Sequence, residues 1–375
     1  MKKIQMVDLK SQYEKIKPEI DAAIQEVIDT TAFVKGPIIN TFQQNLEQYL
    51  GVKHVIPVGN GTDALQISLM ALGLKSGDEV IVPTFTFIAS AEVIALLGLT
   101  PVLVDVEPDT FNASVDAIEK AITPKTKAII PVHLFGQCAD MESIMKIAKQ
   151  HNLYVVEDAC QAIGSVYTFS DGKKVQAGCI GDMGCTSFFP SKNLGCYGDG
   201  GAIFTDNDEL AEQARVIANH GMKVRYYHDL VGVNSRLDSI QAAILNEKLK
   251  HLDAYIAARQ AAADFYDKAF AGCKKIKTPA RYSKSTHVFH QYTLQIEGDR
   301  NALQAALKEK GIPAMIYYPV PLHLQKAYKD ERYQPGDFAV SEKLSSCVLS
   351  LPMHTELDAE QLEYITANVK SLLNE

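Results

Sequence analysis

The stretch that decides the fold is Cys185-Thr186-Ser187-Phe188-Phe189-Pro190-Ser191-Lys192-Asn193-Leu194-Gly195. Its short apolar run predicts a buried β-strand, and Pro190 ends that strand. A second strand is predicted over Ala202–Thr205. Lys192 therefore lies at a strand end between two buried segments, where catalytic groups of α/β proteins tend to lie. A lysine that loses hydration there has a lowered pKa and is suited to form a Schiff base. The alternative is a solvated loop lysine.

The composition is that of an ordinary globular protein with a large core. The chain has 375 residues, of which 47% are hydrophobic and 22% are charged. This length favours two domains, which we place at residues 1–250 and 251–375. The net charge of −8, without a basic stripe, argues against nucleic-acid binding. A ligand that carries phosphate would have to be held by backbone amides and a few cations.

The sequence predicts a cytoplasmic protein that inserts in no membrane and binds no metal. Met1-Lys2-Lys3 is followed by Ile4-Gln5-Met6-Val7-Asp8, which is not the apolar core of a signal peptide, and no apolar run reaches the length of a membrane span. The seven cysteines include no Cys-x-x-Cys pair, which is typical of reduced thiols. His287 and His290 would face opposite sides of a strand-like segment, so a metal site there is not expected.

Strands and helices alternate through the first two thirds of the chain. The other predicted strands are His54–Val58, Glu79–Val82, Pro101–Asp105, Ala128–Val132 and Leu153–Asp158. A helix is predicted before them at Asn40–Leu50, and further helices between and after them at Ile88–Leu97, Val115–Ala121, Met141–His151 and Glu209–Asn219. Continuous apolar strands separated by helices predict a mostly parallel sheet that is covered on both faces. The fold class is therefore α/β.

The last third predicts a smaller α+β unit. A long helix over Asp238–Phe270 would join it to the large domain. Strands are predicted at His290–Ile296 and Ala314–Tyr318, with helices at Arg300–Lys310 and Ala359–Leu373.

A glycine turn follows the strand at His54–Val58. The residues Gly59-Asn60-Gly61-Thr62 lead into a helix opened by Thr62 or Asp63. One interpretation is an N-cap after a tight turn. The other is a phosphate cradle, because free amides and the positive helix end favour an anion. The turn matches neither the G-x-G-x-x-G dinucleotide fingerprint nor a P-loop.

Two adjacent carboxylates, Glu157 and Asp158, end the strand that precedes Ala159. Side chains of a strand alternate, so only one of them can face a given site. A buried carboxylate needs a partner, and a pyridinium nitrogen would suit Asp158. Gln161 could reach a neighbouring ring oxygen, Ser187 could bind a phosphate, and Phe87 could stack on an aromatic ring. One cofactor needs all of these groups together with a Schiff-base lysine: pyridoxal 5′-phosphate.

Several blocks of the sequence resemble the DegT/DnrJ/EryC1/StrS family of sugar aminotransferases. They are Asn60–Leu65, Glu157–Gln161, Thr186–Gly195, Asn234–Asp238, Tyr317–Pro319, Pro321–His323 and Leu351–His354. The similarity covers nearly the whole chain in the expected order. It implies a fold-type I subunit like aspartate aminotransferase, with a large, mostly parallel seven-stranded sheet domain and a smaller C-terminal α+β domain. It also implies a homodimer with active sites at the interface.

The resemblance implies a role for each matching residue. Lys192 would be the Schiff-base lysine, Asp158 would pair with the pyridine nitrogen, and Gln161 would lie near the ring hydroxyl. Phe87 would stack on the ring. The phosphate contacts would be Gly61, Thr62, Ser187 and, from the partner subunit, Asn234.

The resemblance further implies L-glutamate as amino donor and a keto sugar nucleotide as acceptor. The chain is most similar to family members that aminate UDP-2-acetamido-2-deoxy-3-oxo-D-glucuronate at C3 in O-antigen assembly. Arg236 offers a fork for the uronate carboxylate, with an intersubunit salt bridge as the alternative. Tyr317, Tyr318 and His323 are candidate sugar contacts, with packing as the alternative.

The sequence also leaves other functions open. Within the same class, the acceptor could be a 4-keto or 3-keto deoxysugar nucleotide that lacks the carboxylate. A non-catalytic dimer could have kept the fold as a sugar-nucleotide sensor, although the intact Lys192 and Asp158 argue against it. A nicotinamide-dependent oxidoreductase is favoured only by the α/β pattern.

Overall fold

The computed structural model describes residues 2–375 and confirms the α/β class. Its main element is a seven-stranded sheet in the order β1-β9-β8-β5-β4-β2-β3. The strands are β1 His54–Val58, β2 Glu79–Pro83, β3 Thr100–Val104, β4 Thr126–Ile129, β5 Tyr154–Asp158, β8 Met183–Ser187 and β9 Gly201–Thr205. Neighbouring strands from β8 to β3 are parallel, whereas β9 runs antiparallel to both β8 and β1. The sheet is therefore mostly parallel, as predicted.

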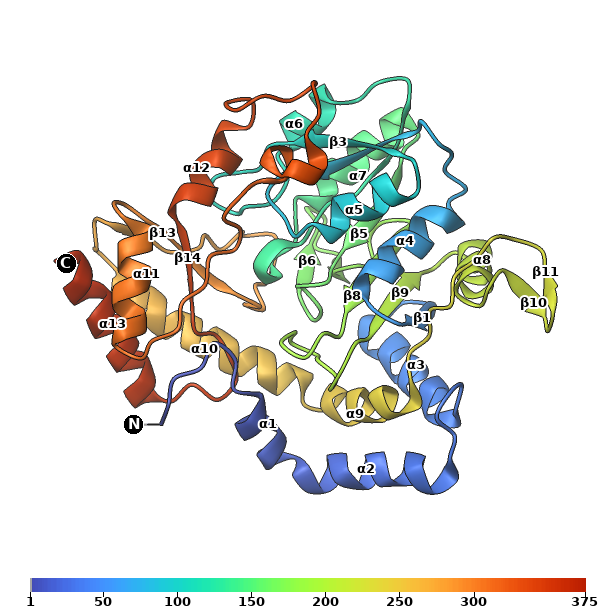
Figure 1. Cartoon of the computed structure of the whole chain (residues 1–375), viewed down its shortest axis with the longest axis horizontal. Helices are drawn as coiled ribbons and strands as arrows, with labels where there is room; N and C mark the ends of the chain where they lie inside the picture. The colour runs from blue at the N-terminus through green and yellow to red at the C-terminus, as the bar shows by residue number, and fades with distance from the viewer. Residues whose placement is uncertain (1) are drawn as a thin grey trace.

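Helices cover both faces of this sheet (Figure 1). They are α3 Pro37–Leu50, α4 Gly61–Ala71, α5 Ala89–Leu96, α6 Val115–Lys120, α7 Met141–His151, α8 Asp208–Ala218 and α9 Ser239–Leu249. Successive residues of β2 show the alternation: Val80 and Val82 pack with α4 and α5, whereas Ile81 packs with α6 and α7. This two-sided burial explains why the parallel strands are continuous apolar runs.

Three peripheral segments complete the large unit. The helices α1 Leu9–Lys15 and α2 Lys17–Thr30 precede α3, and α2 packs along α9. The strands β10 Met222–Val224 and β11 Tyr227–His228 form a hairpin that projects from the body (Figure 1). A second small hairpin pairs β6 Val166–Thr168 with β7 Lys174–Gln176.

The C-terminal unit is built on a three-stranded antiparallel sheet in the order β12-β13-β14. Its elements are α10 Leu252–Phe270, β12 Ile276–Lys277, β13 Tyr292–Ile296, α11 Arg300–Glu309, α12 Ala339–Cys347, β14 Val348–Leu351 and α13 Ala359–Leu373. The two units exchange segments: Ile4 joins the C-terminal core, whereas Leu322 and Phe338 join the core of the large sheet. Because Ile4 and helix α13 pack in the same C-terminal core, the N-terminal and C-terminal segments lie on the same side of the molecule (Figure 1).

Two predicted elements differ from the structure. The helix predicted over Asp238–Phe270 is divided into α9 and α10, with Lys250 and His251 between them. The sequence carries no stop signal there, because Leu249 and Leu252 are both buried and the apolar pattern continues across the break. The strand predicted over Ala314–Tyr318 is reduced to one bridge between Met315 and Ser350. Strand β14 and helix α12 were not predicted.

All seven cysteines are free. Within residues 2–375, no helix combines the length and the apolarity that crossing a bilayer requires.

A carboxylate at the end of β3 joins the two units and gives a first prediction. Asp105 accepts hydrogen bonds from the backbone N–H groups of Val340 (3.0 Å) and Ser341 (2.9 Å), and therefore caps α12. We expect Asp105→Ala to lower the free energy of unfolding by about 2 kcal/mol, because the first amides of α12 lose their acceptor. Urea denaturation measures this change. The exposed Asp116 on α6 supplies the control Asp116→Ala, which should cost less than about 0.5 kcal/mol; equal losses would contradict the capping role.

Candidate active site

The carboxyl ends of β5 and β8 open into one cavity. The two strands are adjacent and parallel, with Asp158 opposite Cys185 in the register. The cavity has a volume of about 800 Å³, which is in the range of cofactor and ligand sites. The predicted site residues that line it are Gly61, Thr62, Phe87, Asp158, Gln161, Ser187, Lys192, Tyr317 and Tyr318. The sheet edge thus brings together nine residues that come from distant segments of the sequence.

Asp158 is buried at the floor of this cavity, with 6% of its surface exposed. Its Oδ2 accepts a hydrogen bond from the hydroxyl of Ser90 (2.7 Å), and its Oδ1 accepts one from the amide of Cys160 (3.1 Å). These two donors fix the orientation of the carboxylate. Ser90, on α5, was not predicted as a site residue, because a serine within an apolar helix carries no recognisable signal.

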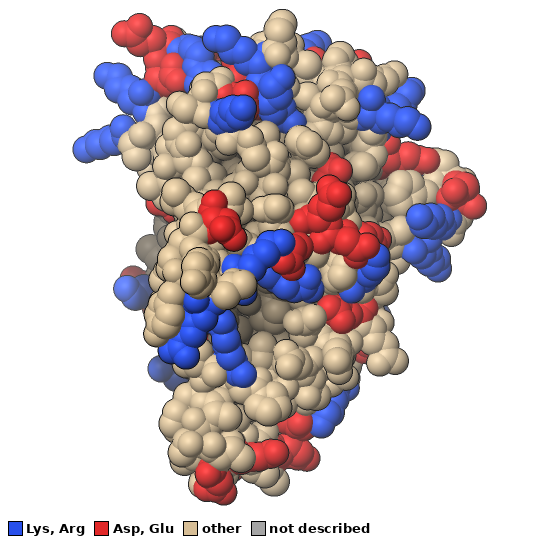
Figure 2. Space-filling view, turned by 90° about the vertical axis from the view of Figure 1, so that its right-hand side faces the viewer, with Lys and Arg blue, Asp and Glu red and all other residues tan. Residues whose placement is uncertain are grey.

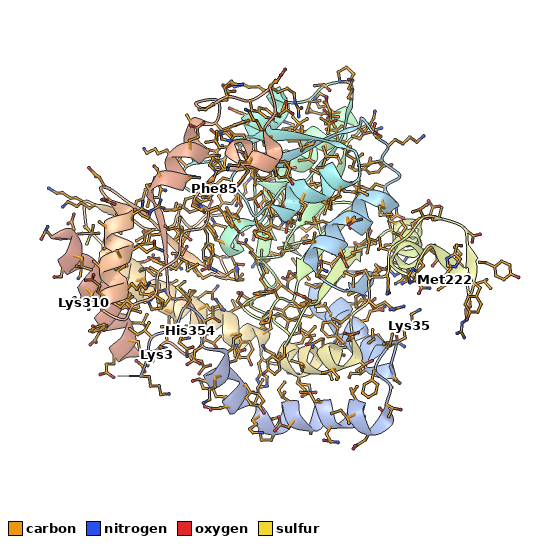
Figure 3. All side chains as sticks on the ribbon, viewed as in Figure 1. Lys3, Lys35, Phe85, Met222, Lys310 and His354 are labelled. Carbon is orange, nitrogen blue, oxygen red and sulfur yellow. The ribbon has the colours of Figure 1, made fainter. Side chains whose placement is uncertain are left out.

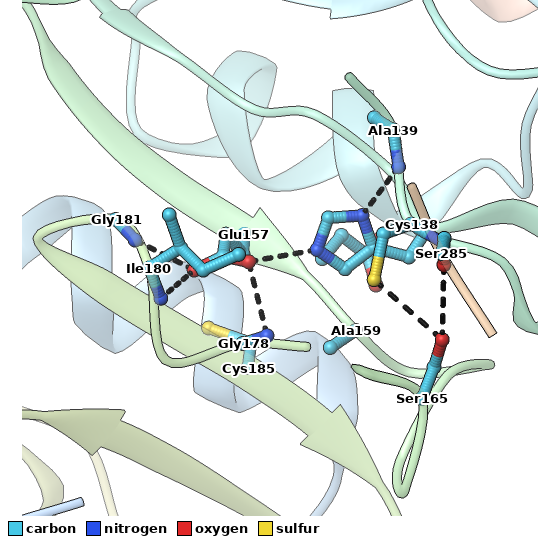
Figure 4. Close-up of polar contacts among 12 residues, drawn as sticks. Cys138, Ala139, Glu157, Ala159, Ser165, Gly178, Ile180, Gly181, Cys185 and Ser285 are labelled. Carbon is cyan, nitrogen blue, oxygen red and sulfur yellow. Dashed lines mark hydrogen bonds and ion pairs between the residues drawn. The ribbon is translucent and has the colours of Figure 1, made fainter. Parts of the chain in front are cut away.

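Strand alternation directs Glu157 to the face of the sheet opposite Asp158, where its hydrogen bonds give it a structural role (Figure 4). It is fully buried and accepts hydrogen bonds from the amides of Gly178 (3.0 Å), Ile180 (2.6 Å) and Gly181 (2.6 Å), and from Nε2 of His133 (2.8 Å). The amide of Ala139 donates to Nδ1 of the same imidazole (3.1 Å). Because Nδ1 accepts, the proton of a neutral ring lies on Nε2 and is donated to Glu157. The carboxylate left for the cavity is therefore Asp158.

Lys192 lies in the loop after β8 and is partly exposed to the cavity. Burial lowers the pKa of its amine below the ordinary value, and the nearby Cys160 thiol and Asp158 carboxylate act in the opposite sense. The loop is held at both sides of the lysine. The amide of Lys192 donates to the carbonyl of Phe189 (2.8 Å), and Nδ2 of Asn193 donates to the carbonyl of Val288 (2.8 Å). Such an amine is less solvated and more nucleophilic than a surface lysine.

The start of α4 forms one end of the cavity. The helix begins at Gly61, and its N-cap is Asn60, whose side chain accepts from the amide of Asp63 (2.8 Å). This corrects the prediction that Thr62 or Asp63 opens the helix. The amides of Gly61 and Thr62 stand in the first turn, where backbone N–H groups lack intrahelical acceptors and favour an anion. Both residues and the hydroxyl-bearing Ser187 line the cavity.

Only glycine fits at the first position of α4. A Cβ atom added to Gly61 would lie 2.8 Å from Cβ of Ser187 and 2.9 Å from Sγ of Cys160. A Cβ added to Gly201 on β9 would lie 2.4 Å from the carbonyl carbon of Asn60. The helix start is thus pressed against the sheet from two sides, which lets its amides approach a ligand closely.

Aromatic and amide groups form the opposite wall. Phe87 is 55% exposed, and the centroid of its ring lies 6.3 Å from that of Tyr318. Nε2 of Gln161 donates to the hydroxyl of Tyr318 (3.1 Å), and its Oε1 accepts from the amide of Phe135 (2.8 Å). Burial raises the pKa of the Tyr318 hydroxyl. A planar ring that stacks on Phe87 would therefore meet polar groups at its rim.

Three predicted residues lie outside this cavity. Arg236 lines a second cavity of about 360 Å³, together with Lys35 and Met222, which lie on the hairpin side of the molecule (Figure 3). On that face, basic and acidic side chains are interleaved around a hollow (Figure 2). Asn234 forms a bridge with Asn219 on the same side. His323 is buried, with Nδ1 at 3.0 Å from the Thr84 hydroxyl and Nε2 at 3.1 Å from Glu342.

Two buried polar atoms in the cavity wall have no partner within residues 2–375. They are Oγ1 of Thr86 and Nδ1 of His290. Buried polar groups in native structures are nearly always hydrogen-bonded, so orphan atoms in a cavity wall favour an additional polar ligand or ordered water. Neither residue was predicted as a site residue. His290 enters the sequence analysis only as a residue that is not expected to bind metal with His287 and as the start of a strand.

Comparison with known proteins agrees with this geometry. Residues 14–370 match the profile of the DegT/DnrJ/EryC1/StrS aminotransferase family. The chain belongs to this family. One similar protein is a UDP-2-acetamido-2-deoxy-3-oxo-D-glucuronate aminotransferase of Pseudomonas aeruginosa. The two sequences are 47% identical over 97% of this chain and 99% of the relative.

Other similar proteins carry different names. A pleiotropic regulatory protein of Geobacillus stearothermophilus is 47% identical over 98% of this chain and 97% of the relative. A UDP-N-acetyl-3-dehydro-α-D-glucosamine 3-aminotransferase of Acidithiobacillus ferrooxidans is 44% identical over 99% and 98%, respectively. The crystal structure of DesV from S. venezuelae, in complex with a ketimine intermediate, superimposes with a TM-score of 0.95 at 39% identity over 100% of both chains.

Family membership makes the protein a sugar-nucleotide aminotransferase that depends on pyridoxal 5′-phosphate. The nicotinamide alternative is thereby set aside. The cavity fits this cofactor on three observations: a lysine with a lowered pKa, a buried carboxylate on the sheet, and a helix start that only glycine can form. The fold-type I architecture predicted from the sequence is also confirmed.

The crowding at Gly61 gives a second prediction. In Gly61→Ala, the new methyl group would push Ser187 and Cys160 aside, so we expect the affinity of the apoenzyme for pyridoxal phosphate to fall at least about tenfold. Absorbance titration of the apoenzyme measures the dissociation constant. Ala71→Gly, at the other end of α4, is the control: it should weaken the helix by about 1 kcal/mol and leave the affinity unchanged. Similar affinities in both variants would contradict the role of Gly61.

Proposed function

We propose that the protein transfers the amino group of L-glutamate to C3 of UDP-2-acetamido-2-deoxy-3-oxo-D-glucuronate. The products would be 2-oxoglutarate and UDP-2-acetamido-3-amino-2,3-dideoxy-D-glucuronate, for the synthesis of O-antigen or another surface polysaccharide. The observation that carries this proposal is the placement of Lys192 and Asp158 in one cavity with the start of α4. The relative from P. aeruginosa supports the choice of substrate.

Each residue of the cavity has a physical task in this reaction. When bound, the cofactor supplies an electron sink for the Cα carbon of the amino donor. Asp158, oriented by Ser90 and Cys160, would hold the proton on the pyridine nitrogen. Lys192 would bind the cofactor covalently, accept the proton from Cα of glutamate, and deliver a proton to C3 of the sugar in the return half.

The remaining contacts hold the cofactor in place. Gly61 and Thr62 would donate backbone N–H groups to its phosphate, and Ser187 would donate its hydroxyl. Gln161 would bond the ring hydroxyl, and the exposed face of Phe87 would stack on the ring. All five residues line the cavity.

Substrate recognition would use a residue from the partner subunit. Arg236 lines the second cavity and not the large cavity of its own chain, although the adjacent Ser235 donates its hydroxyl to Asp63 (2.6 Å) in the first turn of α4. The nearby hairpin and the segment that follows it expose large hydrophobic side chains, among them Tyr227 (70%) and Val231 (88%), a pattern typical of a surface that is covered in an assembly. We therefore propose a homodimer in which Arg236 binds the uronate carboxylate in the partner's site.

The other partner and sugar contacts follow from this arrangement. Asn234 would reach the phosphate of the partner's cofactor. Tyr317 and Tyr318 would contact the sugar in their own cavity, which they line. His323, whose ring nitrogens contact Thr84 and Glu342, would support that wall from behind rather than touch the sugar. The seven free thiols support a cytoplasmic location.

The lowered pKa of Lys192 gives a third prediction. Borohydride reduction of the purified enzyme, followed by peptide mass spectrometry, should place pyridoxal phosphate on Lys192, and Lys192→Ala should carry none. A lowered pKa means that the free amine is available at lower pH. The rate of covalent capture by the apoenzyme should therefore rise with pH and level off below 10.5, the ordinary lysine value. A rate that still rises at that pH would contradict the burial effect.

The same preparation separates catalysis from a regulatory function. The relative named as a pleiotropic regulatory protein favours a second candidate, a sensor that keeps the fold without turnover. An enzyme should release 2-oxoglutarate from glutamate in an amount equal to its cofactor content, even without a sugar. A sensor that carries the cofactor on Lys192 would release none.

Subunit complementation gives a fourth prediction and tests the shared site. Arg236→Ala should lower kcat/KM for the uronate about 10- to 100-fold, since one charged hydrogen-bonding pair is lost. It should have little effect with UDP-N-acetyl-3-dehydro-α-D-glucosamine, which lacks the carboxylate. In a mixed dimer of Lys192→Ala and Arg236→Ala subunits, one of the two sites has both residues intact. Random mixing should therefore restore about one quarter of the wild-type activity.

The mixed dimer distinguishes an Arg236 that acts in the partner's site from one that acts in the site of its own chain. If Arg236 acted in the site of its own chain, no site of the mixed dimer would hold both residues, and activity would stay at the level of the parental variants. Equal losses with both sugars would contradict the carboxylate contact. An acceptor preference for a 4-keto deoxysugar nucleotide would favour the alternative substrate.

A further inference from the structure

Helix α9 runs beside the loop that carries Lys192 and holds it at two points. Oε1 of Gln241 accepts from the amide of Tyr197 (2.8 Å). Nζ of Lys248 donates to the carbonyl of Gly195 (2.6 Å). Gln241 and Lys248 are seven residues apart, which places them on one face of the helix, two turns from each other. That face therefore acts as a rigid support for the second half of the loop.

Lys248 is an unusual residue for this position. Only 1% of its surface is exposed. Within residues 2–375, its Nζ donates to the Gly195 carbonyl and lies 5.2 Å from the centroid of the Tyr197 ring. A buried ammonium without a carboxylate partner opposes folding, whereas a methionine of similar length would not. Burial lowers its pKa to about 8. Core packing alone therefore does not explain a lysine here.

The Gly195 carbonyl lies at the point where the loop closes on itself. A Cβ atom on Gly195 would lie 2.4 Å from the carbonyl oxygen of Pro190. The next residue, Cys196, donates its amide to the carbonyl of Phe188 (2.8 Å). Lys192 stands inside this closed segment, between Pro190 and Gly195. A displacement of Gly195 would therefore move the backbone from which the Lys192 side chain extends.

We propose that Lys248 is a positioning residue for Lys192: it holds the Gly195 carbonyl and thereby keeps the loop in the form that presents the Lys192 amine to the cofactor. This inference rests on the proposed covalent role of Lys192. Lys248 acts through the backbone of the loop, with no contact to the cofactor or the substrate. It thus adds a residue on α9, outside the cavity, to the residues that govern the reaction.

The test compares Lys248→Met with wild type and with Arg300→Met. Arg300 is a matched buried cation in the C-terminal unit that donates to the carbonyls of Val348 (2.6 Å) and Ser345 (3.1 Å). Two quantities are measured: the rate of covalent pyridoxal phosphate capture at Lys192, and the apparent pKa of the cofactor absorbance band in the holoenzyme. Thermal unfolding of each variant reports the change in stability separately.

We expect Lys248→Met to slow capture about tenfold, the effect of a small misplacement of a reacting group, and to shift the absorbance pKa by about one unit. Arg300→Met should leave both quantities unchanged, although it lowers stability. If Lys248→Met does not fold, Lys248→Arg serves in its place: it keeps a donor at altered geometry, and a smaller change of both quantities is expected.

Unchanged capture and absorbance in the Lys248 variant that folds would overturn the inference. Equal changes in Arg300→Met would do the same, because they would reduce the effect to general destabilisation. Failure of the proposed function has a different signature: wild-type protein would then carry no borohydride-stable cofactor on Lys192.

Discussion

The active site depends on two adjacent carboxylates that leave β5 on opposite faces of the sheet. Glu157 is satisfied by three backbone amides and an imidazole inside the fold, whereas Asp158 keeps a position in the cavity. Strand alternation makes the two directions unavoidable. Burying two neighbouring anions is tolerable only because each has its own set of donors. Glu157 thus holds the loop at residues 178–181, while its neighbour Asp158 supplies the carboxylate of the cavity.

A second constraint is the close packing of glycine backbone around the cavity. Gly61 and Gly201 allow the start of α4 to lie against β8 and β9 without side chains between them. Gly195 allows the Lys192 loop to close on Pro190. In each case the absence of a Cβ brings backbone groups to positions that a larger residue would block. The cavity is therefore shaped as much by missing side chains as by reactive ones.

Local patterns in the sequence predicted most of the fold. Apolar runs identified the strands of the large sheet, and helical periodicity located α7 and α13 with the observed ends. The errors have physical causes. The α9–α10 break occurs where the apolar pattern continues, so only packing reveals it. The segment Ala314–Tyr318 has the composition of a strand, but only Met315 pairs with β14. Asn60 rather than Thr62 caps α4 because the cap depends on backbone geometry.

The sequence by itself determined the chemistry: one lysine after a strand, one acid beneath a ring, and a glycine turn for a phosphate identify the cofactor by residue type and order. The tertiary structure decided which groups meet. It assigned Glu157 to the fold and Asp158 to the cavity, placed Arg236 in a different cavity, and brought Ser90, His290 and Lys248 to the site or its support. The reason is that residue type is a local property, whereas burial and hydrogen-bond partners arise from contacts between distant segments. No local pattern encodes those contacts.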